Sequence, residues 1–471
     1  MDLRALFAEL GQAAPPLPVA GVTHDSRKVR PGFVYVALRG RTHDGHAFVG
    51  EALEKGAVAA VGEADLDLPV PYARVGDARR ALSRLAAAFF GEPSRRLFVV
   101  GVTGTDGKTT TAHLIHRLLR ASGKRAGLVS SVGYALEDAW RFPEGHFTTP
   151  EAPELQAVLA EMVAAGLEYA VVETSSHALA QHRVADLAYD LAVWTHLAPE
   201  HLDFHGDMEG YFEAKASLVR RAGFSVLNAG CPYARRLMDR PHLAYGEGGA
   251  LFSRDLREEA GGLAFTLVAG SARIPVRLPM IGAYNVENAL AALAAAKAMG
   301  LGLEAAVRGL EAFPGVPGRM QVLSPAPIRL VVDFAHTPKA LENALNALRP
   351  TTEGRLLVVV GAAGERDPGK RRPLGAVAGR LADLAIFTEE DSRSEPTEAI
   401  LAELAAGARG GRAEVRLEPD REAAIALAAR LACPGDTVLF AGKGHERTLE
   451  RANEVLPWDE AARVRAAFGV D

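Results

Sequence analysis

The chain has little cysteine, with only Cys231 and Cys433 among its 471 residues. These two lie far apart without metal-ligand spacing, which fits a reducing cytoplasm and argues against a structural zinc site. Long apolar runs are also lacking, since no uninterrupted stretch reaches the roughly 18 residues that a membrane span needs. The first residues place no apolar run behind a basic end, so we expect no signal peptide. These absences together predict a cytoplasmic protein without membrane insertion.

A basic excess is absent as well. Lysine and arginine number 53 against 58 aspartates and glutamates, a formal net charge of -5. A general nucleic-acid-binding surface needs the opposite balance, so we expect no nucleic-acid partner. Hydrophobic residues at 48% and charged residues at 24% are typical of a globular protein. The length exceeds what one hydrophobic core supports and predicts about three domains.

Glycine and proline mark two candidate domain boundaries. The first is Gly-Glu-Pro at 91–93, and the second is a Pro/Gly-rich link at 314–322. They predict domains over 1–92, 93–322 and 323–471. After each boundary, apolar strand-like runs alternate with helical stretches: strands at 97–102, 169–172, 191–195, 328–332, 356–360, 385–388 and 438–441, and a helix at 285–299. This alternation predicts an α/β protein whose central domain has a parallel-type sheet, followed by a Rossmann-like C-terminal domain.

The strongest local signal is Gly-Val-Thr-Gly-Thr-Asp-Gly-Lys-Thr-Thr at 101–110, between a predicted strand and a predicted helix. Glycines let backbone N–H groups surround phosphate oxygens, Lys108 can reach the β- and γ-phosphates, and Thr109 can ligate Mg²⁺. The spacing departs from the standard P-loop, because Thr103 stands where the first glycine belongs. The alternative is a tight strand-to-helix turn with an incidental lysine. The pattern favours phosphate binding and does not specify a reaction.

The segment at 104–110 resembles the ATP loop of the Mur ligases and folylpolyglutamate synthetases. Further similar segments are Tyr-Ala-Val-Val-Glu-Thr-Ser-Ser-His at 169–177, residues 196–206, 211–215, Gly-Ala-Tyr-Asn-Val-Glu-Asn at 282–288, Gly-Arg at 318–319 and 333–338. This resemblance implies a set of ATP-binding residues: Gly104, Thr105, Asp106, Gly107, Lys108, Thr109, Thr110, Asn285, Asn288, Arg319 and Asp333. It also implies Mg²⁺ held by Thr109, Glu173, His201 and Lys215, with a CO2-derived carbamate on Lys215. Lys108, His201 and Lys215 are the implied catalytic residues.

Each of these residues also has a structural interpretation. Glu173 could be a buried glutamate paired with protein groups, because an unpaired one is costly. His201 could be a satisfied histidine, Lys215 a solvated helix-face lysine, and the two asparagines helix caps. The segment at 196–206 departs from the family at two positions: His196 stands where asparagine is common, and Glu200 where aspartate is common. We therefore take neither His196 nor Glu200 as a site residue.

The N-terminal region narrows the resemblance to MurE-type ligases. Thr-His-Asp-Ser-Arg at 23–27 is similar to their uridine-nucleotide-binding domain, which implies that Ser26 contacts the UDP group. A serine turn between strands is an equally good local interpretation. The implied contacts to the muramoyl dipeptide are Thr148, Thr149, Ser175, Gln181 and Arg183.

The C-terminal region resembles the amino-acid site of the same ligases. The segments at 364–371 and 442–446 imply contacts from Arg366, Gly442 and Glu446 to the incoming amino acid. Glu-Asp-Ser-Arg at 390–393 replaces the Asp-Asn-Pro-Arg typical of enzymes that use meso-diaminopimelate, in which the arginine binds a substrate carboxylate. Arg393 is kept while acidic residues, including Glu390, are added. The mixed pattern leaves meso-diaminopimelate, L-lysine and L-ornithine open.

By resemblance, the function is ATP-dependent addition of a diamino acid to the D-glutamate γ-carboxylate of UDP-N-acetylmuramoyl-L-alanyl-D-glutamate, through an acyl phosphate. We expect small-molecule substrates, Mg²⁺ and a monomer. One alternative is a folylpolyglutamate synthetase-like ligase, which lacks the uridine domain and the 442–446 segment. Another is a non-catalytic P-loop nucleotide-binding protein, which leaves Lys215 and the asparagine helix unexplained.

Overall fold

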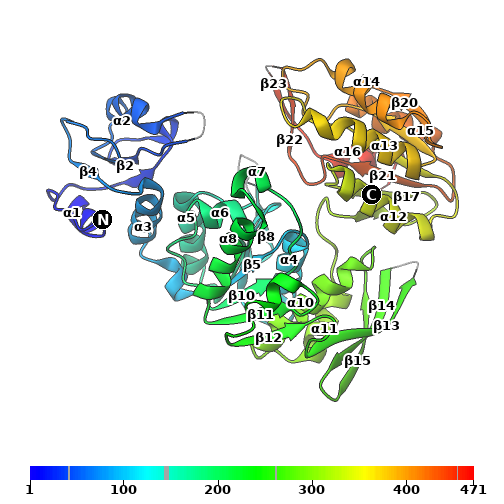
Figure 1. Ribbon diagram of the computed structural model, residues 1–471, viewed down its shortest axis with the longest axis horizontal. Helices are drawn as coiled ribbons and strands as arrows, with labels where there is room; N and C mark the ends of the chain where they lie inside the picture. Colours follow the sequence, from blue (N-terminus) through cyan, green and yellow to red (C-terminus); the bar gives the residue numbers. More distant parts are fainter. Residues whose placement is uncertain (41–42, 143–147, 260–261, 453, 471) are drawn as a thin grey trace. The chain divides into compact units, whose positions relative to one another are not determined.

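The computed structural model describes residues 1–40, 43–142, 148–259, 262–452 and 454–470 (Figure 1). The chain divides into two compact units. Unit 1 comprises Met1–Ser253, Leu267–Arg273 and Asn288–Gly309, and unit 2 comprises Arg254–Thr266, Ile274–Glu287 and Leu310–Asp471. The domain boundaries near residues 92 and 322 stay a prediction. No helix in the described residues is long and apolar enough to cross a membrane.

Unit 1 begins with a small parallel sheet of strand order β1-β2-β3-β4. The strands are β1 (Gly21–Thr23), β2 (Phe33–Val36), β3 (Ala59–Gly62) and β4 (Tyr72–Arg74), with helices α1 (Leu3–Ala8), α2 (Val49–Glu54) and α3 (Ala78–Phe89). Helix α3 begins directly after Asp77, because the Asp77 side chain accepts a hydrogen bond from the backbone N–H of Arg80 and caps the first turn. Apolar residues of α1 and α3 form one core with the sheet.

The part of the large sheet that lies wholly in unit 1 runs β12-β11-β10-β5-β9-β6-β7-β8, parallel from β12 to β6 and antiparallel in β7 and β8. Its strands are β5 (Phe98–Thr103), β6 (Ala126–Ser130), β7 (Gly133–Leu136), β8 (Ala139–Arg141), β9 (Tyr169–Glu173), β10 (Leu191–Trp194), β11 (Phe224–Asn228) and β12 (His242–Tyr245). The helices of this region are α4 (Lys108–Ala121), α5 (Ala152–Ala164), α6 (Ser176–Ala180), α7 (Leu202–His205), α8 (Met208–Arg221) and α9 (Pro232–Arg235). The carboxyl ends of β5 and β9 therefore meet at one edge, where ligands collect in open α/β sheets.

Five elements contain residues of both units: β13 (Leu251–Glu259), β14 (Gly262–Ala269), β15 (Ala272–Leu278), α10 (Tyr284–Ala298) and α11 (Leu303–Glu311). Helix α10 matches the helix predicted at 285–299. The three strands were not predicted. Strand β13 is exposed over most of its length and lacks the apolar run of a buried strand.

Unit 2 contains a six-stranded sheet of order β16-β17-β21-β18-β19-β20, parallel except for the edge strand β16. Its elements are β16 (Gln321–Ser324), β17 (Arg329–Asp333), β18 (Leu356–Val360), β19 (Leu384–Phe387), β20 (Glu414–Leu417), β21 (Thr437–Ala441), the hairpin β22 (Thr448–Arg451) with β23 (Glu454–Pro457), and helices α12 (Pro338–Leu348), α13 (Arg371–Leu381), α14 (Thr397–Ala408), α15 (Arg421–Leu431) and α16 (Glu460–Phe468). Alternate residues of β18 enter two different cores, Val358 with α12 to α14 and Leu357 with α15 and α16. Helices therefore cover both faces of this sheet, as predicted for the C-terminal region.

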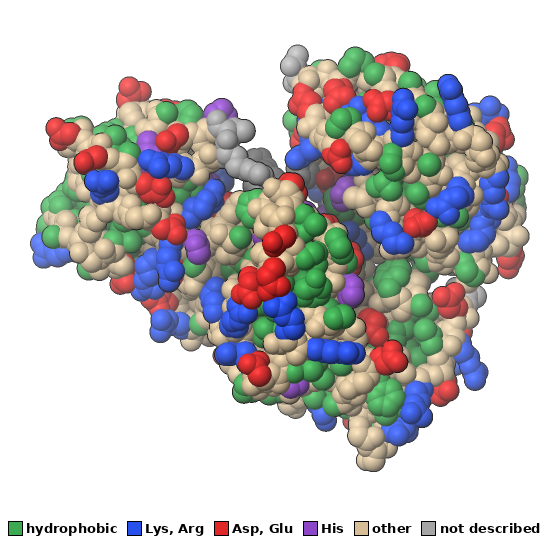
Figure 2. Space-filling view, viewed as in Figure 1, with side chains coloured by type: hydrophobic (Ala, Val, Ile, Leu, Met, Phe, Trp, Pro, Cys, Tyr) green, Lys and Arg blue, Asp and Glu red, His purple; other side chains and the backbone are tan. Residues whose placement is uncertain are grey.

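Charges of both signs are interspersed on the face shown in Figure 2. Most ion pairs among the described residues are at least partly exposed, but that of Arg421 with Glu460 is not. The Arg421 guanidinium and the Glu460 carboxylate are both 0% exposed, with Nη2 2.7 Å from Oε1. Trp458 Nε1 donates to the same carboxylate at 2.6 Å.

We expect Glu460→Ala to lower the free energy of unfolding of unit 2 by about 3–5 kcal/mol, because it leaves the buried Arg421 charge unpaired. Chemical denaturation followed by circular dichroism measures the change. Glu414→Ala, which removes a half-exposed partner of Arg416, is the control and should shift stability by less than about 1 kcal/mol. Equal shifts in the two variants would contradict the prediction.

Candidate functional site

The predicted phosphate loop lies between β5 and α4, as its sequence indicates. Gly107 precedes the first residue of α4 with φ 80°, and a Cβ there would stand 2.2 Å from Oδ1 of Asn288. Only glycine fits both the left-handed backbone and this close approach. Lys108 Nζ donates to the carbonyl oxygen of Thr105 at 2.6 Å, so the lysine folds over the loop. Thr109 and Thr110 lie in the first turn of α4, where N–H groups favour an anion.

Residues outside the motif hold this loop. Thr195 Oγ1 donates to the carbonyl oxygen of Asp106 at 2.6 Å. The hydroxyl of Thr105 lies 3.1 Å from that of Tyr211 and also 3.1 Å from the carbonyl oxygen of Ala198. The sequence did not single out Thr195 or Tyr211, because both come from distant segments that meet the loop only in the folded sheet.

Glu173 is the last residue of β9 and is 1% exposed. Thr109 Oγ1 donates to its Oε1 at 2.9 Å, and the backbone N–H of Ser131 donates to Oε2 at 2.8 Å. The Ser131 hydroxyl adds contacts of 3.1 and 3.0 Å. The structure thus brings Glu173 and Thr109 together, as expected, and Ser131 is a further contact that the sequence missed. A carboxylate and a hydroxyl beside a phosphate loop are oxygen donors of the kind that Mg²⁺ prefers.

Lys215 is not the solvated lysine of the structural interpretation. It lies on α8, is 1% exposed, and donates from Nζ to the carbonyl oxygen of Gly104 at 2.6 Å. Burial, reinforced by the positive charge of Lys108, holds the pKa of the Lys215 ammonium well below its usual range. The ammonium also lies 4.7 Å from the centroid of the Tyr211 ring. A lowered pKa favours the neutral amine, which is the form of a lysine side chain that can add to CO2.

His201 adopts a left-handed backbone with φ 55° just before α7. Its ring centroid lies 4.7 Å from that of His177, and its Nε2 is 3.7 Å from Oε2 of Glu200. Burial and the neighbouring His201 and His205 lower the pKa of His177 to about 4. Among the described residues, no group of three or more His, Cys, Asp or Glu side chains is arranged to hold a metal by itself. Mg²⁺ bound here would therefore need further oxygen ligands, and the cationic side chain of Lys215 could supply one only after conversion to an anion.

Four of the five residues predicted for the muramoyl dipeptide gather beside Glu173. Thr149 Oγ1 donates to the carbonyl oxygen of Glu173 at 2.8 Å, and Ser175 Oγ caps α6. Arg183 donates to the carbonyl oxygen of Thr149 at 3.0 Å and to Gln181 Oε1 at 2.7 Å. Burial lowers the pKa of the Arg183 guanidinium.

The other residues of this predicted set are more separate. Thr148 is the neighbour of Thr149, and its side chain is only partly buried. Ser26 lies in the small N-terminal sheet region, where its Oγ donates to Glu51 Oε2 at 3.1 Å. Asp25 accepts from the backbone N–H of Arg27, so the turn of the structural interpretation is present as well.

Unit 2 contains the other predicted nucleotide contacts. Asp333 ends β17 and accepts from the backbone N–H of Met320 at 2.7 Å. Burial raises the pKa of the Asp333 carboxyl, although Arg319 acts in the opposite direction. The Arg319 guanidinium lies 4.5 Å from the centroid of the Phe334 ring. Asn285 donates from Nδ2 to the carbonyl oxygen of Ile281 at 2.8 Å, so this asparagine also stabilises the start of α10.

The predicted amino-acid residues also lie in unit 2. Glu390 is 6% exposed, its Oε2 has no hydrogen-bond partner in the described structure, and burial raises its pKa. A Cβ on Gly442 would stand 2.9 Å from this oxygen, so the glycine keeps the space beside it open. Glu446 pairs with the buried Lys443 at 2.7 Å, whereas Arg366 is exposed. A buried oxygen without a partner beside a glycine is suited to a donor from a ligand.

Arg393, the remaining predicted residue, is held by the protein. Its Nε lies 2.9 Å from Oε2 of Glu450, and Nη1 donates to the carbonyl oxygen of Gly364 at 2.7 Å. Lys443 is committed in the same way, since its Nζ also lies 2.8 Å from Oδ1 of Asp391. The sequence did not reveal either ion pair.

The chain is similar to known proteins over nearly its whole length. Three family models match the chain: "Mur ligase family, catalytic domain" at 18–90, "Mur ligase middle domain" at 102–296 and "Mur ligase, glutamate ligase domain" at 318–444. A UDP-N-acetylmuramyl-tripeptide synthetase of Deinococcus radiodurans is 51% identical, with 99% of each chain covered. A UDP-N-acetylmuramoyl-L-alanyl-D-glutamate–2,6-diaminopimelate ligase of Geobacillus kaustophilus is 41% identical over 95% of this chain and 94% of the relative. A solved structure of a ligase of that same name is 30% identical, with a TM-score of 0.69, and covers 100% of this chain and 99% of its own.

Proposed function

We propose, because this chain belongs to the Mur ligase family as a MurE-type member, that it joins a diamino acid to UDP-N-acetylmuramoyl-L-alanyl-D-glutamate at the expense of ATP. The new amide forms on the D-glutamate γ-carboxylate, a step of peptidoglycan precursor synthesis. One observation carries the chemistry. The buried Lys215, the paired Thr109 and Glu173, and Lys108 all converge on a single phosphate loop. The family model at 18–90 also matches the N-terminal region that the folate alternative lacks.

A carboxylate is a poor electrophile, so the first step activates it. A γ-carboxylate oxygen attacks the γ-phosphorus of ATP, and the bond from this phosphorus to the β-phosphate oxygen breaks. ADP departs, and the substrate is now an acyl phosphate. Lys108 neutralises charge that gathers on the phosphates, and the loop N–H groups position them. The proposed ATP contacts in unit 1 are Gly104, Thr105, Asp106, Gly107, Lys108, Thr109, Thr110 and Asn288. Those in unit 2 are Asn285, Arg319 and Asp333.

The residues present fit bound Mg²⁺. Thr109 and Glu173 would hold one ion, and His201 with a carbamate on Lys215 would hold a second. Bound Mg²⁺ supplies positive charge that stabilises the anionic phosphoryl oxygens. The carbamate forms when the Lys215 ammonium loses a proton and the resulting amine adds to CO2 with loss of a second proton, so that a buried anion replaces a buried cation. The burial of Lys215 beside Lys108 supports this modification.

In the second step the amine of the diamino acid attacks the acyl carbon. The tetrahedral intermediate loses phosphate, and the nitrogen loses a proton. We propose that Glu446 and Arg366 receive the α-ammonium and α-carboxylate of the amino acid, with Gly442, Glu390 and Arg393 beside them. An acidic and a basic side chain match the two charges of an amino acid.

The dipeptide substrate would contact Ser26 through its UDP group and the following side chains through its muramoyl dipeptide: Thr148, Thr149, Ser175, Gln181 and Arg183. The cluster of four around Thr149 beside Glu173 supports this assignment. We further propose that the protein works in the cytoplasm, since its substrates are nucleotides and an amino acid, and that it is a monomer.

Phosphate release from ATP by the purified protein tests the function. We expect release that requires Mg²⁺, the UDP-muramoyl-dipeptide and one of three amino acids: meso-diaminopimelate, L-lysine or L-ornithine. Mass spectrometry of the product should show the dipeptide extended by one residue. Turnover with none of the three, or turnover that needs no dipeptide, would contradict the proposal.

A further inference from the structure

Arg393 lines a pocket of about 440 Å³ in unit 2 that is rich in acidic groups. Six charged residues line it: Glu389, Arg393, Glu395, Glu398, Asp420 and Arg451. Four carboxylates thus face two guanidinium groups. The Arg451 guanidinium is shared by Glu389 and Asp420, with Nη2 3.0 Å from Asp420 Oδ2. Only Arg393 is left to attract an anion into this pocket.

Glu450 satisfies Arg393 from the hairpin strand β22. Its Oε2 accepts from Nε at 2.9 Å, and its backbone carbonyl oxygen accepts from the N–H of Arg393 at 3.1 Å. On the other side, Nη1 donates to the carbonyl oxygen of Gly364 at 2.7 Å. Arg393 has φ 50°, an uncommon left-handed backbone for a non-glycine residue, so the loop is fixed in this position. Contacts within the protein therefore neutralise the charge of the Arg393 guanidinium and fix its orientation.

The neighbouring buried groups continue this pattern. Lys443, 0% exposed, contacts Asp391 at 2.8 Å and Glu446 at 2.7 Å. Glu390 keeps an oxygen without a hydrogen-bond partner in the described structure and is 6% exposed. The region therefore offers acceptors for a cation, and its buried cations are already paired.

We propose that Glu450 is a specificity-determining residue, which neutralises Arg393 and so restricts the amino-acid substrate to a diamino acid with a single carboxylate. This inference rests on the proposed function. A side chain that ends in an ammonium finds carboxylate acceptors. A side chain that ends in a second carboxylate must displace Glu450 from Arg393 or lie among like charges.

The test compares kcat/KM for L-lysine, L-ornithine and meso-diaminopimelate, with ATP and the UDP-muramoyl-dipeptide saturating. For the wild type we expect the better of L-lysine and L-ornithine to exceed meso-diaminopimelate at least about tenfold. Glu450→Gln keeps the size of the side chain and releases the charge of Arg393. It should shift the preference about tenfold toward meso-diaminopimelate, mainly through KM. Glu450→Gln with Arg393→Gln should lose that gain, because the released cation is gone.

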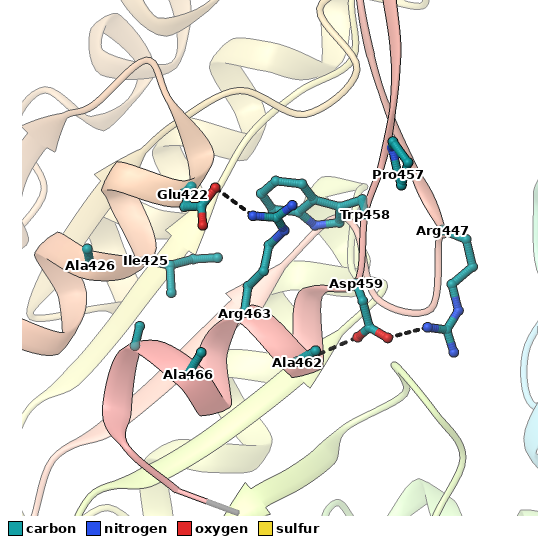
Figure 3. A pocket seen from close by; sticks show the side chains of 11 residues that line it. Glu422, Ile425, Ala426, Arg447, Pro457, Trp458, Asp459, Ala462, Arg463 and Ala466 are labelled. Carbon is teal, nitrogen blue, oxygen red and sulfur yellow. Dashed lines mark hydrogen bonds and ion pairs between the residues drawn. The ribbon is translucent and has the colours of Figure 1, made fainter.

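Glu422→Gln is the matched control. Glu422 pairs with Arg463 beside Trp458, at a different pocket of about 780 Å³ in the same unit (Figure 3). Its loss should leave the preference between the amino acids unchanged. A wild type that prefers meso-diaminopimelate would overturn the inference, as would a Glu450→Gln variant that folds with an unchanged preference. If Glu450→Gln does not fold, the wild-type preference and the Arg393→Gln variant test the inference instead. Because Arg393 is already neutralised by Glu450, Arg393→Gln should lower turnover of meso-diaminopimelate no more than turnover of the other two amino acids. Absence of dipeptide-dependent turnover with every amino acid would instead refute the proposed function.

Discussion

Lys215→Ala is expected to lower kcat/KM by about a thousandfold, the rate cost of losing several kcal/mol of transition-state stabilisation. The wild-type side chain is 1% exposed and reaches the carbonyl oxygen of Gly104 in the phosphate loop. As a carbamate it would place an anion there, and alanine removes the anion entirely. Phosphate release at saturating dipeptide measures the loss. Added acetate should restore part of the rate, because a small carboxylate can enter the space left by the shortened side chain.

Lys124→Ala is the control, since Lys124 is partly exposed and forms a long ion pair of 4.0 Å with Glu168. It should retain wild-type kcat/KM. In ¹³C-bicarbonate, nuclear magnetic resonance should show one carbamate signal in the wild type that Lys215→Ala lacks and Lys124→Ala keeps. Full activity of Lys215→Ala, or a carbamate signal that survives in it, would contradict the assignment.

The sequence predicts the phosphate loop well because its conformation is local. Glycine at 107 is required by a left-handed backbone, and the loop lies between an apolar strand and a helix that the pattern also predicts. The parallel strands are predictable for a similar reason, since β9, β18 and β21 are continuous apolar runs buried on both faces.

Long-range pairing is what the sequence could not give. Ser131 binds Glu173 across 42 residues, and Glu450 binds Arg393 across 57. In both cases the packing of the sheet places a polar residue that lies in a loop or a partly exposed strand. No periodic pattern in the sequence predicts the contact. The consequence differs between the two. Ser131 donates hydrogen bonds to Glu173, whose role was already expected, whereas Glu450 neutralises the positive charge of Arg393.

Glu173→Gln is expected to lower kcat/KM by about a thousandfold at millimolar Mg²⁺, with the loss reduced at higher Mg²⁺ concentration. The carboxylate is 1% exposed and receives hydrogen bonds from Thr109 and Ser131. Glutamine preserves its size and removes the negative charge, so Mg²⁺ affinity falls while packing is retained. The amide oxygen can still accept from Thr109 and from the Ser131 hydroxyl, and only the hydrogen bond from the Ser131 N–H is lost, so the melting temperature should fall by only a few degrees.

Glu168→Gln provides the comparison, since Glu168 is an exposed residue immediately before β9. It should keep both the rate and the Mg²⁺ dependence of the wild type. A Glu173→Gln variant that loses activity but shows an unchanged Mg²⁺ dependence would mean that Glu173 acts only through its hydrogen bonds to the loop. Glu173 would then be a buried glutamate paired with protein groups and not a Mg²⁺ ligand. A steeper Mg²⁺ requirement with intact folding separates the metal role from the structural one.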